Sequence, residues 1–305
     1  MLWLASFFSS LSLGGSGFAN PLQLSGVVLE IRIQRVIVDN LISLSLALPT
    51  LLLQKELSND LVDPYVLGTL SGAFLFISLG ALIFGLIALQ QSTSFALGFL
   101  GSLIVGTFVA FASLRGGASK ALIMGLAISI SLQGLSSLLA YLVASSLNRP
   151  FLPLLLGTTE YVDRSTAFSL AIASVLALVG SIALIDEATA VGFGEDFARS
   201  LGIKPERTLA KSVIVASIGA GSVTGCCGIL PFLGLISANI GKRLCPLEPY
   251  YEIFTTFLIA STVMMTSDAL SSYVETPYGS LPVGAFLSTM GGLSLALLIL
   301  RSELI

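Results

Sequence analysis

The sequence of 305 residues lacks histidine and has few charged residues. Without histidine the chain cannot build a Ser-His-Asp triad, a histidine metal site or a histidine proton relay. Only 10% of the residues are charged, whereas soluble domains carry about 25%. The net charge of −3 indicates no basic surface of the kind that binds nucleic acid. We therefore expect neither nucleic-acid partners nor histidine-based catalysis.

Cysteine is also scarce, and the three residues Cys226, Cys227 and Cys245 show no CxxC spacing. We interpret them as small apolar residues and expect neither a zinc site nor a redox motif. A P-loop is absent as well, so the chain does not bind and hydrolyse ATP by that route. No cofactor and no resident metal are predicted.

What the sequence has in abundance is apolar residues, at 55% of the chain and a mean hydropathy of +0.97. Continuous apolar runs such as 121–145 and 166–184 favour helices, because the strands of a membrane barrel alternate over about 10 residues. We predict an all-α integral membrane protein, with residues 1–305 forming one transmembrane domain of about ten helices. The predicted spans are 2–18, 36–54, 64–89, 93–113, 120–144, 166–185, 208–226, 230–241, 250–269 and 282–300.

The first and eighth of these spans are short for a crossing of about 20 residues. The first has no basic residues before its apolar stretch, and the apolar region of a signal peptide is the alternative interpretation. With the N-terminus inside and ten spans, ten basic residues lie inside and four outside, which agrees with the positive-inside rule. The inner set is Lys55, Arg115, Lys120, Arg199, Lys204, Arg207, Lys211, Lys242, Arg243 and Arg301, and the outer set is Arg32, Arg35, Arg149 and Arg164.

A short charged segment at 192–205 interrupts the apolar runs, on the predicted cytoplasmic side. Acidic residues at 195 and 196 favour the positive N-terminal end of a helix, and Gly202 suits a left-handed C-terminal cap. Phe193, Phe197 and Leu201 are spaced four residues apart and share one helix face. From the residues alone, this helix either lies on lipid headgroups or docks on another protein.

Asp39 is the one acidic residue clearly inside the outer half of a predicted span. It follows Arg35 by four residues, so an ion pair along the helix is expected, with a polar contact in a transport pathway as the alternative. Arg32 and Arg35 precede the same span, and the residues alone suggest that they anchor it in the headgroups.

Several motifs of the sequence resemble those of one protein family. GEDFARSLG at 194–202 resembles the GEExARSLG cytoplasmic segment of the FecCD-type permeases, the membrane subunits of ABC importers for ferric siderophores, haem and cobalamin. Further matches follow in the family's order from about residue 29 to 300. They are 32–35 (RLPR in the family), Gln54 with 59–68 (Q…NPLADP..LG), 125–127 (LAGvA), 228–235 (GpIgFvGL), Asp268 (aD..aR), and 281–284 with 291–292 (LPvGv…GGP).

The chain departs from the family pattern at four places. Gln34 and Asp60 replace prolines, and Ala238-Asn239 stands where the family has Pro-His or Pro-Asn, so the bend of the eighth span is expected to differ. Ser272 stands where aD..aR has arginine, which removes one outer docking charge.

The resemblance implies a type II ABC importer permease fold, no enzymatic activity in this chain, and coupling helices at about 187–207 that dock in a cleft of the ATPase subunit. It implies that Arg32 and Arg35 meet acidic residues of a binding protein. It also implies a cytoplasmic gate near Asn59 and Ser119, for which surface turns are the alternative. The implied coupling residues are Phe193, Gly194, Glu195, Phe197, Arg199, Leu201 and Gly202.

The implied function is import of an iron–siderophore complex across the bacterial cytoplasmic (inner) membrane, with haem or cobalamin as the alternative substrates and with both termini cytoplasmic. The implied partners are an ATPase subunit, a second permease, identical or homologous, a periplasmic or lipid-anchored binding protein, and membrane lipid. An ion-coupled secondary transporter would need a buried charge network, of which the sequence offers little. A membrane-embedded enzyme would need a cluster of catalytic residues, and none is recognised.

Overall fold

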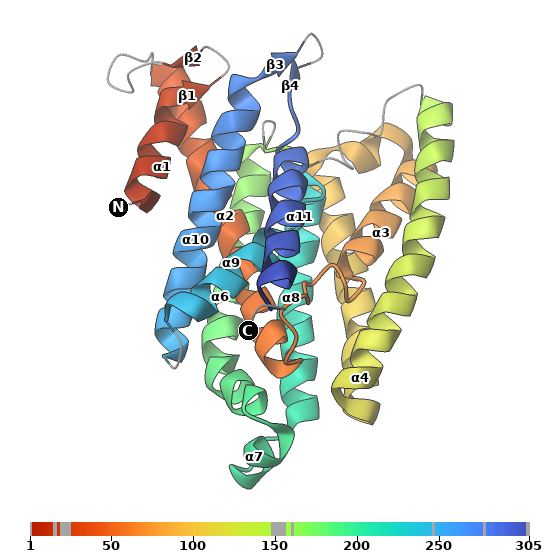
Figure 1. Ribbon diagram of the computed structural model, residues 1–305. Helices are drawn as coiled ribbons and strands as arrows, with labels where there is room; N and C mark the ends of the chain where they lie inside the picture. The colour runs from red at the N-terminus through yellow and green to blue at the C-terminus, as the bar shows by residue number, and fades with distance from the viewer. Residues whose placement is uncertain are drawn as a thin grey trace.

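Nearly all of the chain that the structure describes is helical (Figure 1). The computed structural model describes residues 2–14, 17–18, 26–147, 157–159, 162–245, 248–276 and 279–302. The helices are α1 (Leu2–Ser12), α2 (Gly26–Glu56), α3 (Thr69–Phe84), α4 (Gln91–Leu147), α6 (Arg164–Gly192), α7 (Glu195–Ser200), α8 (Pro205–Cys227), α9 (Leu233–Leu244), α10 (Pro249–Tyr273) and α11 (Val283–Ser302), with a 3₁₀ turn at Gly85–Leu89.

Two short antiparallel hairpins mark one end of the bundle, and α7 marks the other (Figure 1). One hairpin pairs β1 (Leu13–Gly14) with β2 (Gly17–Phe18), and the other pairs β3 (Glu275–Thr276) with β4 (Gly279–Ser280). We call these the hairpin end and the α7 end.

Six helical segments of the described chain are long and apolar enough to cross a membrane. One of them, α4, has 57 residues and folds back at Gly116–Gly117, where Gly117 has a φ of 67° that favours glycine. Its two limbs, 91–115 and 118–147, correspond to the spans predicted at 93–113 and 120–144. The short helices α1 and α9 and the 20-residue helix α11 complete the bundle.

The predicted first span is corrected by the structure. Its helix ends at Ser12, and the hairpin β1–β2 follows. Eleven residues of helix rise about 16 Å, roughly half of the hydrocarbon thickness of a bilayer, so α1 does not make a full crossing. The expected short eighth span is α9, which has 12 residues.

The central helix is α2, which packs against α6, α8, α9 and α10. Large apolar side chains such as Ile42 and Leu46 are fully or almost fully buried there. Pro49 lacks the amide hydrogen that would bond the carbonyl of Ser45 one turn earlier. The chain nevertheless continues through Pro49 as one helix of 31 residues.

Small residues let α8 approach its neighbours closely. A Cβ at Gly98 of α4 would lie 2.8 Å from the Cα of Gly225 in α8. A Cβ at Gly219 would lie 1.9 Å from the backbone oxygen of Ser45 in α2. Glycine at these positions is therefore required by the close packing of α8 against its neighbours.

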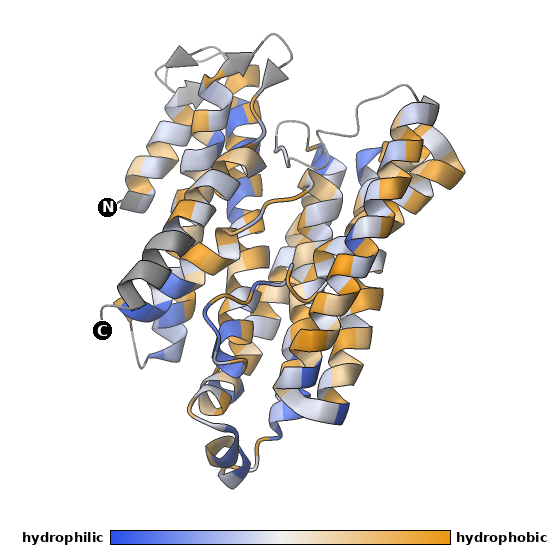
Figure 2. Cartoon of the chain, turned by 45° about the vertical axis from the view of Figure 1, so that its right-hand side comes forward, coloured by the Kyte–Doolittle hydropathy of each residue, from blue (hydrophilic) through white to orange (hydrophobic). Residues whose placement is uncertain are grey.

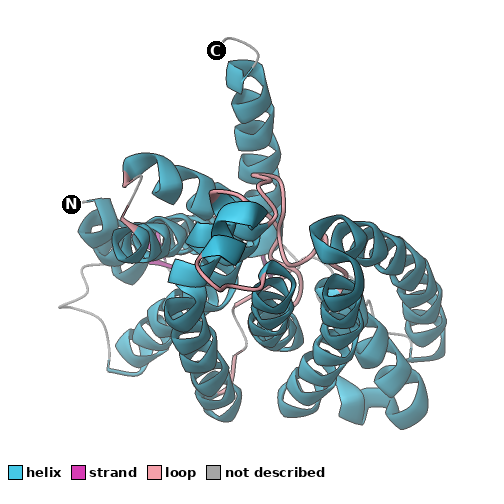
Figure 3. Cartoon of the chain, turned by 90° about the horizontal axis from the view of Figure 1, so that it is seen from below, coloured by secondary structure: helices cyan, strands magenta, loops and turns pink. Residues whose placement is uncertain are grey.

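Apolar residues predominate along the long helices, and hydrophilic residues are frequent at the α7 end (Figure 2). Exposed apolar residues gather on the second limb of α4 and on α6, among them Ile123, Ile130, Leu138, Phe168 and Val179. Such outward faces suit helices surrounded by lipid or by other membrane helices. Viewed from the α7 end, α11 extends away from the rest of the bundle (Figure 3).

Candidate coupling surface and buried polar contacts

The helix α7 projects beyond the rest of the bundle between α6 and α8 (Figure 1). Gly194 at its start has a φ of 132° and Gly202 after its end has a φ of 80°, both conformations that residues with a Cβ rarely adopt. Ala198 is completely buried on a small apolar cluster, formed with Ala190, Val191 and Ile203. The helix therefore has one fixed inner face and presents its other residues to the outside.

The outer apolar residues of this segment are exposed, but they do not share one helix face as their spacing predicts, because Gly194 separates Phe193 from the helix that begins at Glu195. Phe193 is 67% exposed, Phe197 48% and Leu201 59%. The two phenylalanine rings pack edge to face, with centroids 6.1 Å apart. This pair forms an apolar projection that the rest of the described chain leaves largely uncovered.

The charged side chains around the projection form ion pairs with one another. Arg199 donates to Glu206 at 2.5 Å and to Glu195 at 3.3 Å. These hydrogen bonds, chiefly the one to Glu206, raise the pKa of Arg199. Arg199 thereby joins α7 to the first turn of α8 and gives the projection a defined orientation.

The two residues expected at a gate lie at the same end. Ser119 is exposed and lines a polar cavity of about 290 Å³ together with Glu195 and Glu206. Asn59 is half-buried in the loop after α2, and its side-chain oxygen accepts from the amide of Leu61 at 2.9 Å. The same loop is held by Asn239 of α9, which donates to the Asp60 carbonyl at 2.8 Å.

A cavity of about 390 Å³ lies at the base of α7, beside two ion pairs. Lys55 at the end of α2 pairs with Glu252 of α10 at 2.5 Å, and Lys242 of α9 pairs with Asp60. No local sequence pattern points to Glu252, because only the folded chain brings α10 beside the end of α2. The cavity is lined by Gln54, Lys55, Ser58, Asp60, Thr189, Gly192, Phe193, Lys242 and Glu252.

Arg32 and Arg35 both have partners within the chain. Arg32 is 5% exposed and donates to the Leu11 carbonyl at 2.6 Å. Arg35 forms an ion pair with Asp268 of α10 at 2.7 Å and also donates to Ser272. Serine at 272, where the family pattern has arginine, thus accepts from an arginine of α2.

The ion pair expected between Arg35 and Asp39 is not formed in the structure. Arg35 reaches across to α10, where Asp268 also accepts from the Thr159 hydroxyl at 2.5 Å. Asp39 is fully buried, and neither of its carboxylate oxygens accepts a hydrogen bond from the residues that the structure describes. Arg35 and Asp39 are neighbours along one helix, but the ion pair of Arg35 is formed with Asp268 of another helix.

Comparisons with known proteins agree with the all-α membrane fold. The family model of the FecCD transport family matches residues 2–301. The ferric enterobactin transport system permease protein of Escherichia coli is 26% identical over 81% of this chain and 75% of its own length. The hemin transport system permease protein of Yersinia pestis is 26% identical over 90% of this chain and 83% of its own.

Solved structures show the same fold. A putative metal-chelate type ABC transporter in an inward-facing conformation has a TM-score of 0.84 at 19% identity, covering 98% of this chain and 96% of that one. PsaBC from Streptococcus pneumoniae, in complex with Fab, has a TM-score of 0.61 at 14% identity, covering 95% and 92%. The all-α permease fold predicted from the sequence is confirmed, and the chain is a multi-pass membrane protein and not an enzyme. With the family model matched over nearly its whole length, this chain belongs to the FecCD transport family of ABC importer permeases.

Proposed function

We propose that this chain imports an iron–siderophore complex across the bacterial cytoplasmic membrane by alternating access, driven by a separate ATPase subunit that docks on α7. The observation that carries the proposal is the projection formed by Phe193 and Phe197 beyond the end of the bundle. A rigid aromatic pair flanked by charges suits a pocket on a protein partner, because aromatic anchors contribute most of the binding energy at interfaces.

Three further features support an ATPase, and not lipid, as the partner of α7. The helix is held in one orientation by Ala198 and by the Arg199–Glu206 contact. Its exposed face mixes apolar and acidic residues, and acidic residues are repelled by anionic headgroups. The base of α7 also touches the gate region, since a Cβ at Gly192 would lie 3.2 Å from the Lys55 carbonyl. A movement of α7 would thus act on the end of α2 and on the loop that carries Asn59.

The distribution of basic residues supports a cytoplasmic α7 end. Lys55, Arg115, Lys120, Arg199 and Lys242 belong to segments at the α7 end. Arg32, Arg35 and Arg164 belong to helix starts at the opposite end. Arg149 lies outside the described residues. This asymmetry has the sense that the positive-inside rule requires.

Variants of α7 test the coupling proposal. Phe197→Ala and Glu195→Ala, co-expressed with the ATPase subunit, are expected to reduce both co-purification of the ATPase and substrate-stimulated ATP turnover. Phe254→Ala is the matched control, because Phe254 is a 56% exposed phenylalanine of α10 outside α7. Wild-type co-purification and turnover in both α7 variants would refute the coupling role.

The substrate is tested by growth. A strain lacking this permease is supplied with single iron sources, and the proposal expects rescue by at least one ferric siderophore only when the permease is restored. Haem is the second candidate, because one relative is named as a hemin permease. Rescue by haem or cobalamin alone would replace the siderophore proposal with one of those substrates.

We further propose a second permease subunit in the assembly and a binding protein at the hairpin end, with Arg32 and Arg35 as its contacts. Since both arginines are engaged within the chain, contact with a binding protein would require them to exchange partners. Charge reversal at Arg32 is expected to slow association with the binding protein, most clearly at low salt. An unchanged association rate would remove Arg32 from the docking site.

A further inference from the structure

The end of α2 contacts the base of α7 through its backbone. Gly192, the last residue of α6 before α7, leaves room for the Lys55 carbonyl, since a Cβ there would lie 3.2 Å from that oxygen. Phe193 follows Gly192 and lines the same cavity of about 390 Å³ as Lys55. A displacement of the segment that carries Phe193 would therefore act directly on the end of α2.

The Lys55 side chain connects this point to a third helix, α10. Its Nζ lies 2.5 Å from Oε2 of Glu252 in the first turn of α10, and the two side chains are only 11% and 5% exposed. Separation of such a pair leaves uncompensated charges in a largely dry site, which is strongly unfavourable. The end of α2 and the start of α10 are therefore held together when either of them moves.

The helix α10 is in turn connected to α9 and to the loop after α2. Helices α9 and α10 pack against each other. Lys242 of α9 forms an ion pair with Asp60 of the loop, and the Asn239 amide donates to the Asp60 carbonyl at 2.8 Å. A movement of α10 would thus reach the loop that holds Asn59.

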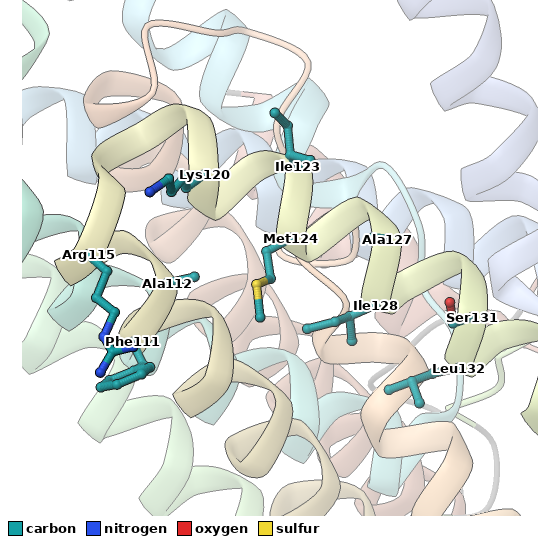
Figure 4. Close-up of a pocket in the computed structure, with 10 residues that line it drawn as sticks. All are labelled: Phe111, Ala112, Arg115, Lys120, Ile123, Met124, Ala127, Ile128, Ser131 and Leu132. Carbon is teal, nitrogen blue, oxygen red and sulfur yellow. The ribbon is translucent and has the colours of Figure 1, made fainter.

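The turn of α4 at 115–120, the other segment expected at the gate, lies beside exposed charges of α7. This turn closes one end of a groove of about 740 Å³ between the two limbs of α4 (Figure 4). It shares a polar cavity with Glu195 and Glu206, whose partner Arg199 is 47% exposed. Exposed ion pairs hold their partners weakly, because water competes for both charges. Of the ion pairs in the described part of the α7 end, only Lys55–Glu252 has both side chains largely buried.

We propose that the Lys55–Glu252 ion pair carries a movement of α7 to α10, and with α10 to α9 and the loop that holds Asn59. This inference rests on the proposed function, in which the ATPase subunit moves α7. Lys55 and Glu252 are positioning residues in this role and act without contact to the substrate. Because the pair is buried, α2 and α10 respond as one unit instead of sliding past each other.

The thiol of Cys245 is a natural reporter of this movement. It lies at the end of α9, before α10 begins, and is partly exposed, whereas Cys226 and Cys227 are buried. The transporter, assembled with its ATPase subunit in nanodiscs, is labelled with a water-soluble maleimide with and without ADP and vanadate, and the label on this chain is measured. We expect the trapped nucleotide to change the rate of labelling at least about fivefold.

Reversal of the two charges tests the pair. Lys55→Glu and Glu252→Lys are each expected to abolish the nucleotide response while the ATPase still co-purifies, and the exchanged pair Lys55→Glu/Glu252→Lys is expected to restore it. Lys211→Glu is the matched control and should keep the response, because the Lys211–Glu187 pair at the same end is 55% and 36% exposed. Glu252→Gln serves if a reversed charge prevents assembly, and the same loss is expected.

Three results would overturn the proposal. An undiminished response in both single variants would remove the pair from the connection. A response that the exchanged pair does not restore would show that the two residues matter separately and not as a pair. Labelling of Cys245 that ignores the nucleotide in the native chain would show that the movement does not reach α9. The docking of the ATPase on α7 fails separately, since a Phe197→Ala variant with the full nucleotide response would refute it whatever the ion pair does.

Discussion

The guanidinium of Arg35 on α2 lies 2.7 Å from the carboxylate of Asp268 on α10. The two residues are 233 positions apart in the sequence. Asp268 also accepts from Thr159, so three segments of the chain meet at one carboxylate. The contact fixes the central helix to α10 and draws inward an arginine that the sequence places at the outer surface.

Loss of this ion pair should destabilise the protein. Asp268 is 3% exposed, and Asp268→Asn removes the ionic partner of Arg35 in a largely dry site. We expect a loss of up to about 3 kcal/mol, at the low end for buried pairs because Arg35 remains 19% exposed. Thermal unfolding in detergent measures it. Arg164→Gln is the control, since the Arg164–Glu30 pair is exposed, and an equal loss in both variants would contradict the account.

Replacement of Asp39, in contrast, should not destabilise the protein. Its carboxyl group is buried without a hydrogen-bond partner among the described residues, so an amide of the same shape breaks no hydrogen bond that the carboxyl group makes there. Asp39→Asn is expected to keep or raise the unfolding temperature, whereas transport falls if Asp39 belongs to the pathway. A marked drop in unfolding temperature would show that the Asp39 carboxylate has a stabilising partner.

The approach of α8 to α2 depends on Gly219. A Cβ there would lie 1.9 Å from a backbone oxygen, which cannot move aside as a flexible side chain does. Gly219→Ala should therefore cost about 1–3 kcal/mol of stability. Gly134→Ala is the matched control, because Gly134 is a helical glycine with no atom near the added Cβ, and a neutral or stabilising effect is expected. Equal effects at the two positions would rule out the packing argument.

Asp163 caps the start of α6 and makes this helix sensitive to acid. It accepts from the Thr166 amide at 2.9 Å and from the Ser165 hydroxyl at 3.0 Å, and these bonds lower its pKa below the ordinary value of 3.8. A lowered pKa gives stability that is complete above the ordinary value and is lost as the pH falls through the lowered one.

Asp163→Ala should cost about 0.5–2 kcal/mol at neutral pH, measured by thermal unfolding. Asp163→Asn keeps a capping oxygen but does not titrate, so it should retain most of the stability and show a weaker loss in acid. A variant with the acid sensitivity of the wild type would place the titrating group elsewhere.

Local patterns were sufficient to predict α7 and the fold-back of α4. The charged segment between two apolar runs predicts a short helix, although the helix begins at Glu195 and leaves Phe193 before it. The charged and glycine-containing turn at 115–120 likewise separates two apolar runs. The partner of Arg35 could not be predicted in this way. Asp39 is near Arg35 in sequence, but the position of Asp268 depends on how α2 and α10 pack.

Other features of the structure also depend on helix packing, which local sequence patterns do not specify. The Lys55–Glu252 pair at the base of α7 requires α10 to lie beside the end of α2. The groove between the limbs of α4 arises from the angle at Gly116–Gly117, which composition does not specify. In the N-terminal segment the apolar pattern continues beyond Ser12, although the chain turns there into a hairpin.

The central claim, that α7 binds the ATPase subunit, is tested most directly by cross-linking. In a Cys245→Ser background, where Cys226 and Cys227 stay buried, Phe197→Cys supplies one exposed thiol on α7. Treatment of the assembled transporter with a short thiol-to-amine cross-linker should join this chain to the ATPase subunit at Phe197→Cys and not at Phe254→Cys. Absence of a product with the ATPase at Phe197→Cys, while the ATPase remains in the complex, would contradict the account.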